Sequence, residues 1–380
     1  MHPARVADVG VLRDNQTMPL ELTAADVARM RAVNQLLPAG PARTIAATAS
    51  WMLAVQAQDY TASKWVIGSR THGSVRDRDI EVALERREIV RSWPLRGTLH
   101  ITAAADLGWM LELAAARPLR SAKTRQESLG LPLPTLERSA ELTHEILADG
   151  RILARDAFLT ELADQGIDGS GQRGAHLIGY LAQTFVICLG PRVGKQHGIV
   201  LAESWLPPTP RLSREEALHR LALGYVRGHG PVDAADLAWW AMLLKSEATA
   251  AMASIQEELE EFDYDGRTVA VLKDSPALVP EMITEGRRSM TALGAFDELI
   301  LGYRDRQPNL SDEHFELVVP GKNGMFLRTL QHGGRIRGTW RTDPKSASGA
   351  AVVPFDTLTA DERTGFERAL AEHARFVSAQ

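Results

Sequence analysis

The sequence predicts an α+β protein in which three tandem units of helices and a β-hairpin precede a β-rich C-terminal part. A short pattern supports the repetition: glycine, any residue, an aliphatic residue, three further residues and aspartate recur at 73–79, 150–156 and 230–236. The copies begin 77 and 80 residues apart, and this regular spacing favours structural repeats. After residue 257 the sequence alternates mainly in the manner of strands.

Each copy of the pattern is expected to end a helix at glycine, to form a short strand at the aliphatic residue and to start another helix. A winged helix begins in this order and continues with the helix that enters a DNA groove and a β-hairpin wing. We therefore predict three tandem winged-helix units. Residues 1–130 hold an N-terminal extension and the first unit, 131–206 the second, and 207–380 the third with a C-terminal hairpin region and a closing helix.

The first unit has clear local signals. Residues 23–26 resemble a capping box that opens a helix through residue 37, and a second helix is expected at about 44–55. Residues 88–93 and 97–102 alternate like strands on either side of Pro94-Leu95-Arg96. These two strands predict the first wing.

The elements of the second and third units are predicted from the same kinds of sequence signal. Strands at 184–190 and 198–203 are expected to close the second unit, and the proline-rich segment 207–210 is the clearest linker. The third unit is predicted to contain helices at 214–227, 233–242 and 246–255. Beyond it we expect strands at 268–272, 315–319, 325–331 and 335–340, and a final helix at 360–376. The sequence His332-Gly333-Gly334 predicts a hairpin turn between the last two strands.

Composition limits the possible classes of protein. The chain has 380 residues and a net charge of −5. Its length and its hydrophobic fraction of 44% are ample for a buried core. The most apolar windows, 177–189 and 237–244, are too short to span a bilayer and no secretory leader is evident, so we expect a cytoplasmic, nucleoid-associated protein without membrane partners. Cys188 is the only cysteine, which excludes an internal disulfide and predicts a small core residue.

Basic residues are unevenly distributed. Thirty-six of the 43 are arginine, whose fork suits phosphate and base edges. Residues 321–345 contain six basic residues and one acid. The six are Lys322, Arg328, Arg335, Arg337, Arg341 and Lys345. This asymmetry predicts a polyanion-binding face, although a solvated arginine-rich hairpin is an equal alternative.

Several common catalytic motifs are absent from the sequence. It has no H-E-x-x-H, G-x-x-x-x-G-K-[ST], G-x-S-x-G, or G-x-G-x-x-G after a strand, which disfavours metalloproteases, P-loop enzymes, α/β-hydrolases and dinucleotide enzymes. The 11 histidines lack metal-ligand spacing. We therefore predict neither a metal nor a cofactor.

The triplet Gln56-Ala57-Gln58 follows an apolar helix. In an extended segment residues two apart share a face, so both amides are able to converge on one water molecule or one polar ligand edge. Most such triplets are solvated surface, so the surrounding motifs decide its interpretation.

Seven motifs, the first of which contains the triplet, lie between Trp51 and Trp340. They occupy residues 51–59, 92–100, 238–240, 295–298, 301–306, 320–326 and 333–340. In combination they resemble the AlkZ-type DNA glycosylases, also described as winged-helix DNA-binding domain proteins. The resemblance implies a C-shaped clamp of three tandem winged helices, and it places this chain in the glutamine-any-glutamine branch through Gln56 and Gln58.

The resemblance also implies an activity. It is hydrolysis of the N-glycosidic bond of bulky N7-alkylguanine and related cationic adducts, with unhooking of interstrand crosslinks and self-resistance to a DNA-alkylating antibiotic. The partner would be double-stranded DNA carrying alkylated bases, bound by a monomer. The preferred adduct, the choice between crosslink and monoadduct, and base flipping stay open.

The chemistry fits two neutral amides. Alkylation at N7 puts positive charge on the base and makes it a good leaving group, so catalysis must place a water and stabilise an oxocarbenium-like sugar. We assign Gln56 and Gln58 as the catalytic residues that hold this water. The reaction is expected to be monofunctional, because Lys64, the nearest lysine, falls within the next predicted helix.

DNA contacts are predicted on two hairpins. Arg91 and Arg96 flank the first wing and are candidates for phosphate contacts, while Thr98 and His100 share a strand face that would line the groove. The C-terminal hairpin is predicted to insert into the minor groove. Its candidate contacts are Lys322, Arg328, Gln331, His332, Arg335 and Arg337, with Gln331, His332 and Arg335 at the tip.

Other polar and aromatic motifs receive structural interpretations. Trp239 and Trp240 are expected in the core. Asp297, Glu298, Tyr303 and Arg304 are expected to form a polar cluster without an assigned role.

Two alternative functions remain. A non-catalytic winged-helix transcriptional regulator would need basic wings but no paired glutamines, and would usually dimerise on a palindromic site. A drug-sequestering protein would bind the alkylating compound itself in the absence of DNA.

Overall fold

The computed structural model describes residues 20–38, 43–322, 324–346 and 349–378. Helices alternate with three separate sheets of three, four and six strands. The predicted α+β class is therefore confirmed.

One order of elements occurs three times: a helix, a short strand, two helices and a hairpin. The first set consists of α2 (Ile45–Met52), β2 (Val55–Gln56), α3 (Tyr60–Gly68), α4 (Asp77–Glu85), β3 (Ile89–Leu95) and β4 (Thr98–Ala103). The second consists of α7 (Leu133–Ile146), β5 (Leu153–Ala154), α8 (Arg155–Asp164), α9 (Arg173–Gln183), β6 (Ile187–Val193) and β7 (Gln196–Leu201). The third has α11 (Arg214–His229), α12 (Ala234–Ala241), α13 (Lys245–Ala253), β8 (Leu259–Tyr264) and β9 (Arg267–Leu272). In the third set a single bridge at Val232 replaces the short strand.

The short strand always pairs with the second strand of its own hairpin. The register partners are Val55↔Ile101, Leu153↔Ile199 and Val232↔Ala270. The predicted first copy of the glycine pattern is therefore misplaced, because residues 73–76 lie between α3 and α4, residues 77–79 begin α4, and Val75 forms no strand. Its true counterpart is Val55. The preceding helix α2 ends at Leu53, which has a positive φ of 63°, so a search for glycine misses this boundary.

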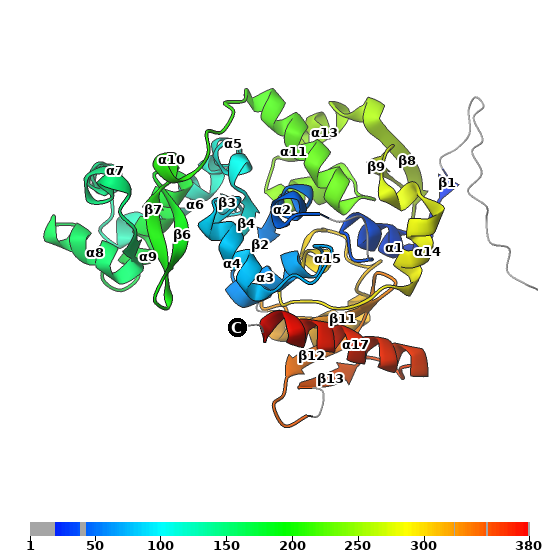
Figure 1. Cartoon of the computed structure of the whole chain (residues 1–380). Helices are drawn as coiled ribbons and strands as arrows, with labels where there is room; N and C mark the ends of the chain where they lie inside the picture. Colours follow the sequence, from blue (N-terminus) through cyan, green and yellow to red (C-terminus); the bar gives the residue numbers. More distant parts are fainter. Residues whose placement is uncertain (1–19, 39–42, 323, 347–348, 379–380) are drawn as a thin grey trace, which may run out of the picture.

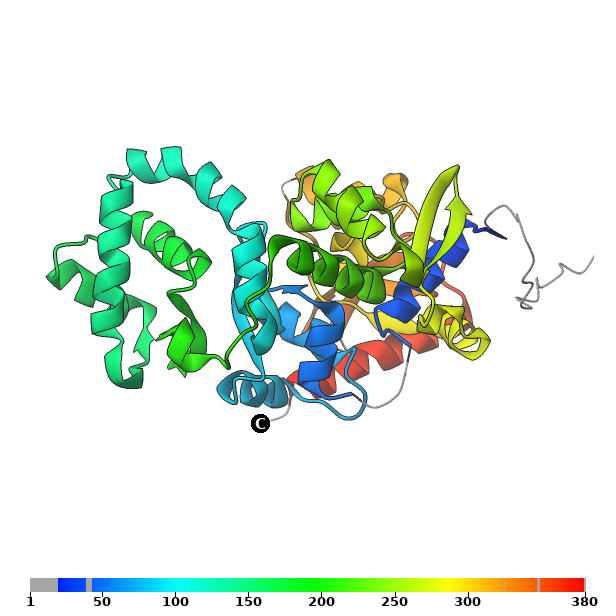
Figure 2. The same cartoon turned by 90° about the horizontal axis from the view of Figure 1, so that it is seen from above.

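The first two sets share one sheet. Its strand order is β2-β4-β3-β6-β7-β5, and the two hairpins meet where Arg91 pairs with Leu189. Helices α5 (Leu107–Ala114) and α6 (Ala116–Ser128) connect the sets, and Figure 2 shows α6 crossing from the first to the second. The second set forms one end of the molecule, while the remaining elements pack together on the other side (Figure 1).

The N-terminal elements belong spatially with the third set. Strand β1 (Leu20–Glu21) runs parallel to β8, and α1 (Ala24–Asn34) packs against α14 (Pro280–Arg288). The predicted capping box is confirmed, because Thr23 and Asp26 exchange hydrogen bonds across the first turn of α1. The helix ends at Asn34, three residues before the predicted boundary.

The C-terminal part is a four-stranded sheet closed by a helix. The strands are β10 (Met290–Ala292), β11 (Thr329–His332), β12 (Arg335–Thr342) and β13 (Ala350–Pro354), and α17 (Ala360–Val377) packs against β10. The predicted hairpin and final helix are confirmed. The predicted strand at 315–319 is wrong, because these residues mostly belong to α16 (Asp312–Val318). Ser311 at the N-cap position and the acids Asp312 and Glu313 in the first turn favour that helix.

A large buried core lies under the third set, where Tyr225, Trp240 and Trp109 have almost no exposed surface. Cys188 is buried in a second cluster, as predicted, and burial raises the pKa of its thiol. Across the described ranges, every helix is too short or too polar to cross a bilayer. The short helix α10 (Ala202–Trp205) follows β7.

Candidate active site

The glutamine triplet lies where α2 gives way to β2. Residues 55 and 56 are extended and pair with β4, so the predicted end of the helix before the triplet is confirmed. Gln56 is half-buried, Ala57 is buried and Gln58 is exposed. Ala57 therefore anchors the segment while the two glutamines flank it, as extended backbone requires.

The backbone of Ala57 is held from two sides. Its N–H donates to the carbonyl oxygen of Leu99 at 2.7 Å, and its carbonyl oxygen accepts from Nε and Nη2 of Arg91 at 3.1 and 2.7 Å. Arg91 is only 6% exposed, and burial lowers its pKa to about 10. This burial does not fit the predicted phosphate contact, so Arg91 instead positions the triplet.

A buried carboxylate holds Gln56 itself. Glu298 begins the short helix α15 (Glu298–Leu301) and has no exposed surface. Its Oε1 accepts the backbone N–H of Gln56 at 3.0 Å, and its Oε2 accepts the indole N–H of Trp240 at 3.1 Å. The side-chain Oε1 of Gln56 is buried and has no protein donor within the described residues. This oxygen is therefore an acceptor that remains for a water or a substrate group.

The sequence did not assign Glu298 a function. Its partner Gln56 is 242 residues away along the chain, so local patterns carry no sign of the contact. The one available signal was the motif at 295–298, which has no other obvious chemistry. A charged residue with no exposed surface and two hydrogen-bonded partners is rare enough to mark a site for attention.

Arg96, Thr98 and His100 come together beside Gln56. His100 is the register partner of Gln56, and its Nε2 accepts from Nη2 of Arg96 at 3.1 Å. Because arginine only donates, the His100 proton resides on Nδ1, which donates to the carbonyl oxygen of Thr98 at 2.9 Å. Burial and the charge of Arg96 lower the pKa of His100 to about 3, so the ring is neutral.

This network changes the predicted role of His100. The side chain has no exposed surface, so it does not line a DNA groove but orients Arg96 next to Gln56. The hydroxyl of Thr98 is also buried and has no partner among the described side chains. Arg96 itself is partly exposed at the wing turn and remains a candidate for contact with DNA.

The electrostatics keep Glu298 ionised. Burial alone would raise its pKa, but the neighbouring His229 and the positive charge of Arg96 lower the pKa to about 2. His229 Nε2 lies 3.6 Å from Glu298 Oε2, slightly beyond a normal hydrogen bond. The carboxylate therefore lies among donors from the first and third sets of elements.

An aromatic and cationic cluster adjoins this network. The guanidinium of Arg306 lies 4.7 Å from the ring centre of Trp239 and 5.8 Å from that of Phe326, and Arg96 approaches Trp239 at 5.7 Å. Trp239 is half-buried, whereas Trp240 is fully buried. The predicted core position is thus confirmed for Trp240 and does not hold for Trp239, whose ring lies between two arginines.

Asp297, which was expected in a structural polar cluster without an assigned role, forms a buried ion pair with Arg70. Its carboxylate accepts from Nη2 and Nη1 of Arg70 at 2.6 and 3.1 Å, and Arg70 also donates to Gln35 Oε1 at 2.9 Å. Both charged side chains are fully buried. This bidentate pair fixes the start of α15 against α3, and with it the position of Glu298.

The C-terminal hairpin does not present a free tip. Gln331 is fully buried; its Nε2 donates to the hydroxyls of Ser289 and Thr291 at 2.9 and 3.0 Å, and its Oε1 accepts from Gly334 N–H at 2.8 Å. The turn packs against α1, where a Cβ on Gly334 would overlap the carbonyl oxygen of Ala28. The predicted insertion of this tip into the minor groove is therefore not compatible with its packing.

The other predicted contacts of this hairpin are mostly engaged within the protein. His332 Nδ1 and Arg337 Nε each lie 3.1 Å from Glu362 Oε1, and Arg328 lies 5.1 Å from the ring centre of Trp340. Arg335 is exposed. The side chain of Lys322 lies outside the described residues.

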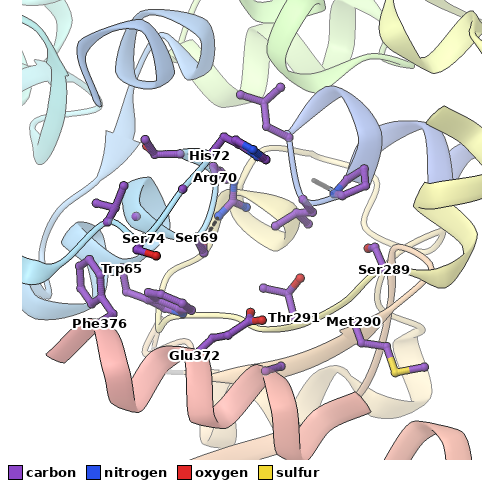
Figure 3. A pocket seen from close by; sticks show the side chains of 18 of the residues that line it. Trp65, Ser69, Arg70, His72, Ser74, Ser289, Met290, Thr291, Glu372 and Phe376 are labelled. Carbon is purple, nitrogen blue, oxygen red and sulfur yellow. Dashed lines mark hydrogen bonds between the residues drawn. The ribbon is translucent and has the colours of Figure 1, made fainter. Parts of the chain in front are cut away.

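A large cavity lies apart from the glutamine triplet. It encloses about 690 Å³ between α3, the loop that follows it, α14, β10 and α17 (Figure 3). Trp65 and Arg70 line one side, and Thr291 and Glu372 line the other. Neither Gln56 nor Gln58 lines this cavity, so the triplet does not form the enclosed pocket that is usual for a small-molecule enzyme. Within the described ranges, no three His, Cys, Asp or Glu side chains are grouped to hold a metal.

Comparisons with known proteins agree on one family. The model of the family described as DNA glycosylase AlkZ-like matches residues 49–376. The interstrand DNA cross-link repair glycosylase of Streptomyces sahachiroi is 24% identical over 319 residues, which cover 79% of this chain and 82% of the relative. The solved structure of Streptomyces sahachiroi DNA glycosylase AlkZ superposes with a TM-score of 0.76 at 22% identity and covers 94% of this chain and 98% of that chain. The fold is thus shared over nearly the full length of both chains.

Proposed function

The chain belongs to the AlkZ-like DNA glycosylase family, and from this we propose that it removes bulky N7-alkylguanine-type adducts from double-stranded DNA by hydrolysing the N-glycosidic bond. The observation that carries the proposal is the buried, unpartnered Oε1 of Gln56, held beside Arg96 and His100 by Glu298. The relative from Streptomyces sahachiroi is an interstrand DNA cross-link repair glycosylase, which supports crosslinks as substrates. Protection against a DNA-alkylating antibiotic follows from that substrate class.

In the proposed reaction, Gln56 and Gln58 position the water that replaces the damaged base. Gln56 and Gln58 accept hydrogen bonds from one water and hold it below C1′ of the damaged nucleotide. As the C1′–N9 bond breaks, its electron pair moves to the alkylated base, which leaves uncharged. The water oxygen bonds to C1′ and its proton passes to solvent. No lysine nucleophile takes part, because Lys64 Nζ is engaged by Asp77 and Glu81 at 2.7 Å each.

The repeated order of elements supports three tandem winged-helix units arranged as a C-shaped clamp. We place the units at 1–130, 131–206 and 207–380, with β1 and α1 of the first segment packing on the third unit, and propose that one copy of the chain acts as a monomer. The exposed position of Gln58 suits a bulky adduct, because the glutamine lies outside the 690 Å³ cavity. Among the predicted DNA contacts, Arg96 and Arg335 keep that role in the proposal.

The direct test uses a duplex with one N7-alkylguanine. The purified chain and its Gln56→Ala/Gln58→Ala variant are incubated with this duplex, and abasic sites are revealed by alkaline cleavage and gel electrophoresis. We expect strand cleavage with the wild type and little with the double variant. Binding of DNA without cleavage on several adducts would instead assign the protein to the regulators.

A further inference from the structure

Helix α6 is exposed along almost its whole length. Of its 13 residues only Gln126 is buried. Most helices in folded proteins are stabilised by an apolar face that packs on the core. In α6 this face is narrow: Pro118, Leu119 and Ala122 are half-buried, and Leu119 packs on the cluster around Cys188. The Lys123–Glu127 pair is exposed and 4.0 Å apart, so it adds little to stability. Core packing therefore accounts for this one face and not for the exposed basic residues.

The exposed surface of α6 is basic. Arg117, Arg120 and Lys123 follow one another at intervals of three residues, so they lie on neighbouring positions of one helix side. Glu127 is the single acid and lies in the last turn. Arg125 is already engaged, since its Nη2 donates to Gln172 Oε1 at 2.6 Å. The stripe therefore presents three cations toward solvent, and its one acidic neighbour on the helix is Glu127, 4.0 Å from Lys123.

The position of α6 relates this stripe to the triplet. The helix starts against the wing turn, where a Cβ on Gly97 would lie 3.3 Å from Pro118, and the preceding residue Arg96 contacts His100 beside Gln56. Arg117 Nη1 donates to the carbonyl oxygen of Met242 at 2.9 Å, which fixes the same end to the third set of elements. Figure 2 shows that α6 then leads away toward the second set. The helix is about 20 Å long, which equals roughly six base pairs of duplex DNA.

We propose that α6 binds the phosphate backbone of the DNA that flanks the lesion. The proposal rests on the proposed function in taking duplex DNA as the partner. Phosphates are the expected target because an evenly spaced row of flexible cations matches a row of anions and contains no paired amide to read a base edge. Contact of this kind strengthens binding to any sequence and places the damaged nucleotide near Gln56 without touching it.

The test is the salt dependence of binding. Arg120→Gln/Lys123→Gln is compared with the wild type by fluorescence anisotropy on an undamaged duplex over a series of salt concentrations. Loss of two phosphate contacts should lower the slope of log K against log salt by about 2 and weaken binding roughly 3- to 10-fold. The single-turnover excision rate at saturating enzyme should not change. An unchanged slope would overturn the proposal.

A matched control is available on helix α17. Arg368→Gln/Arg375→Gln removes two exposed cations of α17 that line the 690 Å³ cavity. We expect the wild-type slope for this variant, and a reduced slope here with a normal slope for the α6 variant would move the DNA to the cavity. Thermal unfolding of both variants excludes loss of fold. Because binding is measured without excision, a reduced slope in the α6 variant supports the interface even if the wild type fails to release any base.

Discussion

The Gln56 network and helix α6 hold charge in opposite ways. Around Gln56, the charge of Glu298 is withdrawn from solvent and engaged by Gln56 N–H and Trp240 N–H, and the half-buried Arg96 is held by His100. On α6, Arg120 and Lys123 extend into solvent from a helix that buries almost nothing. Buried and partnered charges are costly to place and fix geometry, whereas exposed charges attract a polyanion at long range. The comparison suggests that chemistry and DNA affinity reside in separate parts of the molecule.

Loss of the glutamine side chains of the triplet should have the largest effect on the excision rate, and it would sharpen this comparison. Gln56→Ala or Gln58→Ala should lower the single-turnover excision rate by about 10- to 1000-fold, because a group that positions water in the transition state is removed. The dissociation constant for DNA should stay within about twofold, since neither residue supplies charge. Gln165→Ala, at an exposed glutamine in the second set, is the control and should keep the wild-type rate. Full activity in both folded triplet variants would remove the assignment.

A smaller effect is expected from Glu298→Gln. The amide keeps one oxygen but turns an N–H group toward either Gln56 N–H or Trp240 N–H, so one of the two hydrogen bonds is lost. We expect a fall of about 10- to 100-fold in the excision rate with unchanged DNA binding. Glu362→Gln is the matched control, because Glu362 is also buried, has a pKa lowered to about 2 and contacts His332 and Arg337 instead.

The Glu298 variant can also show whether the residue acts through Gln56. In a Gln56→Ala background the additional loss from Glu298→Gln should be much smaller than in the wild type, because the side chain that Glu298 positions is gone. Equal losses in both backgrounds would mean that Glu298 supports the fold or the reaction independently of Gln56. Single-turnover rates of the four proteins are sufficient to decide.

The pH dependence should separate stability from catalysis. His100, His197 and His373 have pKa values lowered by burial to about 3, 4 and 4, so the folded chain keeps these rings neutral while the unfolded chain protonates them below about 6.5. The unfolded state therefore binds more protons, and the free energy of unfolding falls as pH decreases from 6.5 toward 4. The excision rate should stay flat between pH 5 and 8, because Glu298 and His100 do not titrate there.

Thermal unfolding and single-turnover rates over the same pH range test this prediction. His373→Gln should reduce the loss of melting temperature between pH 6.5 and 4.5, since one buried neutral ring no longer favours the protonated unfolded chain. A rate that changes tenfold between pH 5 and 8 would show that another ionisable group takes part in the reaction.

Local signals made much of the fold predictable. Thr23 and Asp26 form their capping box within one helical turn, and the strands β11 and β12 follow from alternation and a double-glycine turn. The extended conformation of Gln56 also follows from nearby sequence, because the apolar helix ends just before it. In each case the decisive interactions join residues close together along the chain.

The contacts that define the site were not predictable in this way. Glu298 reaches Gln56, and Asp297 reaches Arg70, across more than 200 residues of sequence. Arg91 and Gln331 look like surface contacts until tertiary packing buries them. The sequence could therefore identify the reacting glutamines but not the groups that hold them, nor the burial of the hairpin tip.

The smallest expected effect concerns helix α4, which is acidic whereas α6 is basic. This helix occupies the third-helix position, which enters the DNA groove in winged-helix regulators. It carries four acids and one arginine, Arg78, whose side chain is 66% exposed. Its Asp77 and Glu81 are engaged by Lys64 at 2.7 Å, so they serve internal packing. An acidic helix of this kind would be repelled by DNA phosphates, which disfavours a regulator that docks through the first unit.

Arg78→Gln therefore should leave the salt slope of DNA binding unchanged, in contrast to Arg120→Gln on α6. Both variants remove one exposed arginine from a helix of the same half of the chain, and Arg78 lies 3.7 Å from Glu85 on its own helix. Anisotropy titrations at four salt concentrations resolve a slope difference of about 1, the amount expected for one phosphate contact. If Arg78→Gln reduced the slope as much as Arg120→Gln, DNA would have to approach α4 despite its acids. The position of a helix within its unit would then decide where DNA binds more strongly than the charge of that helix does.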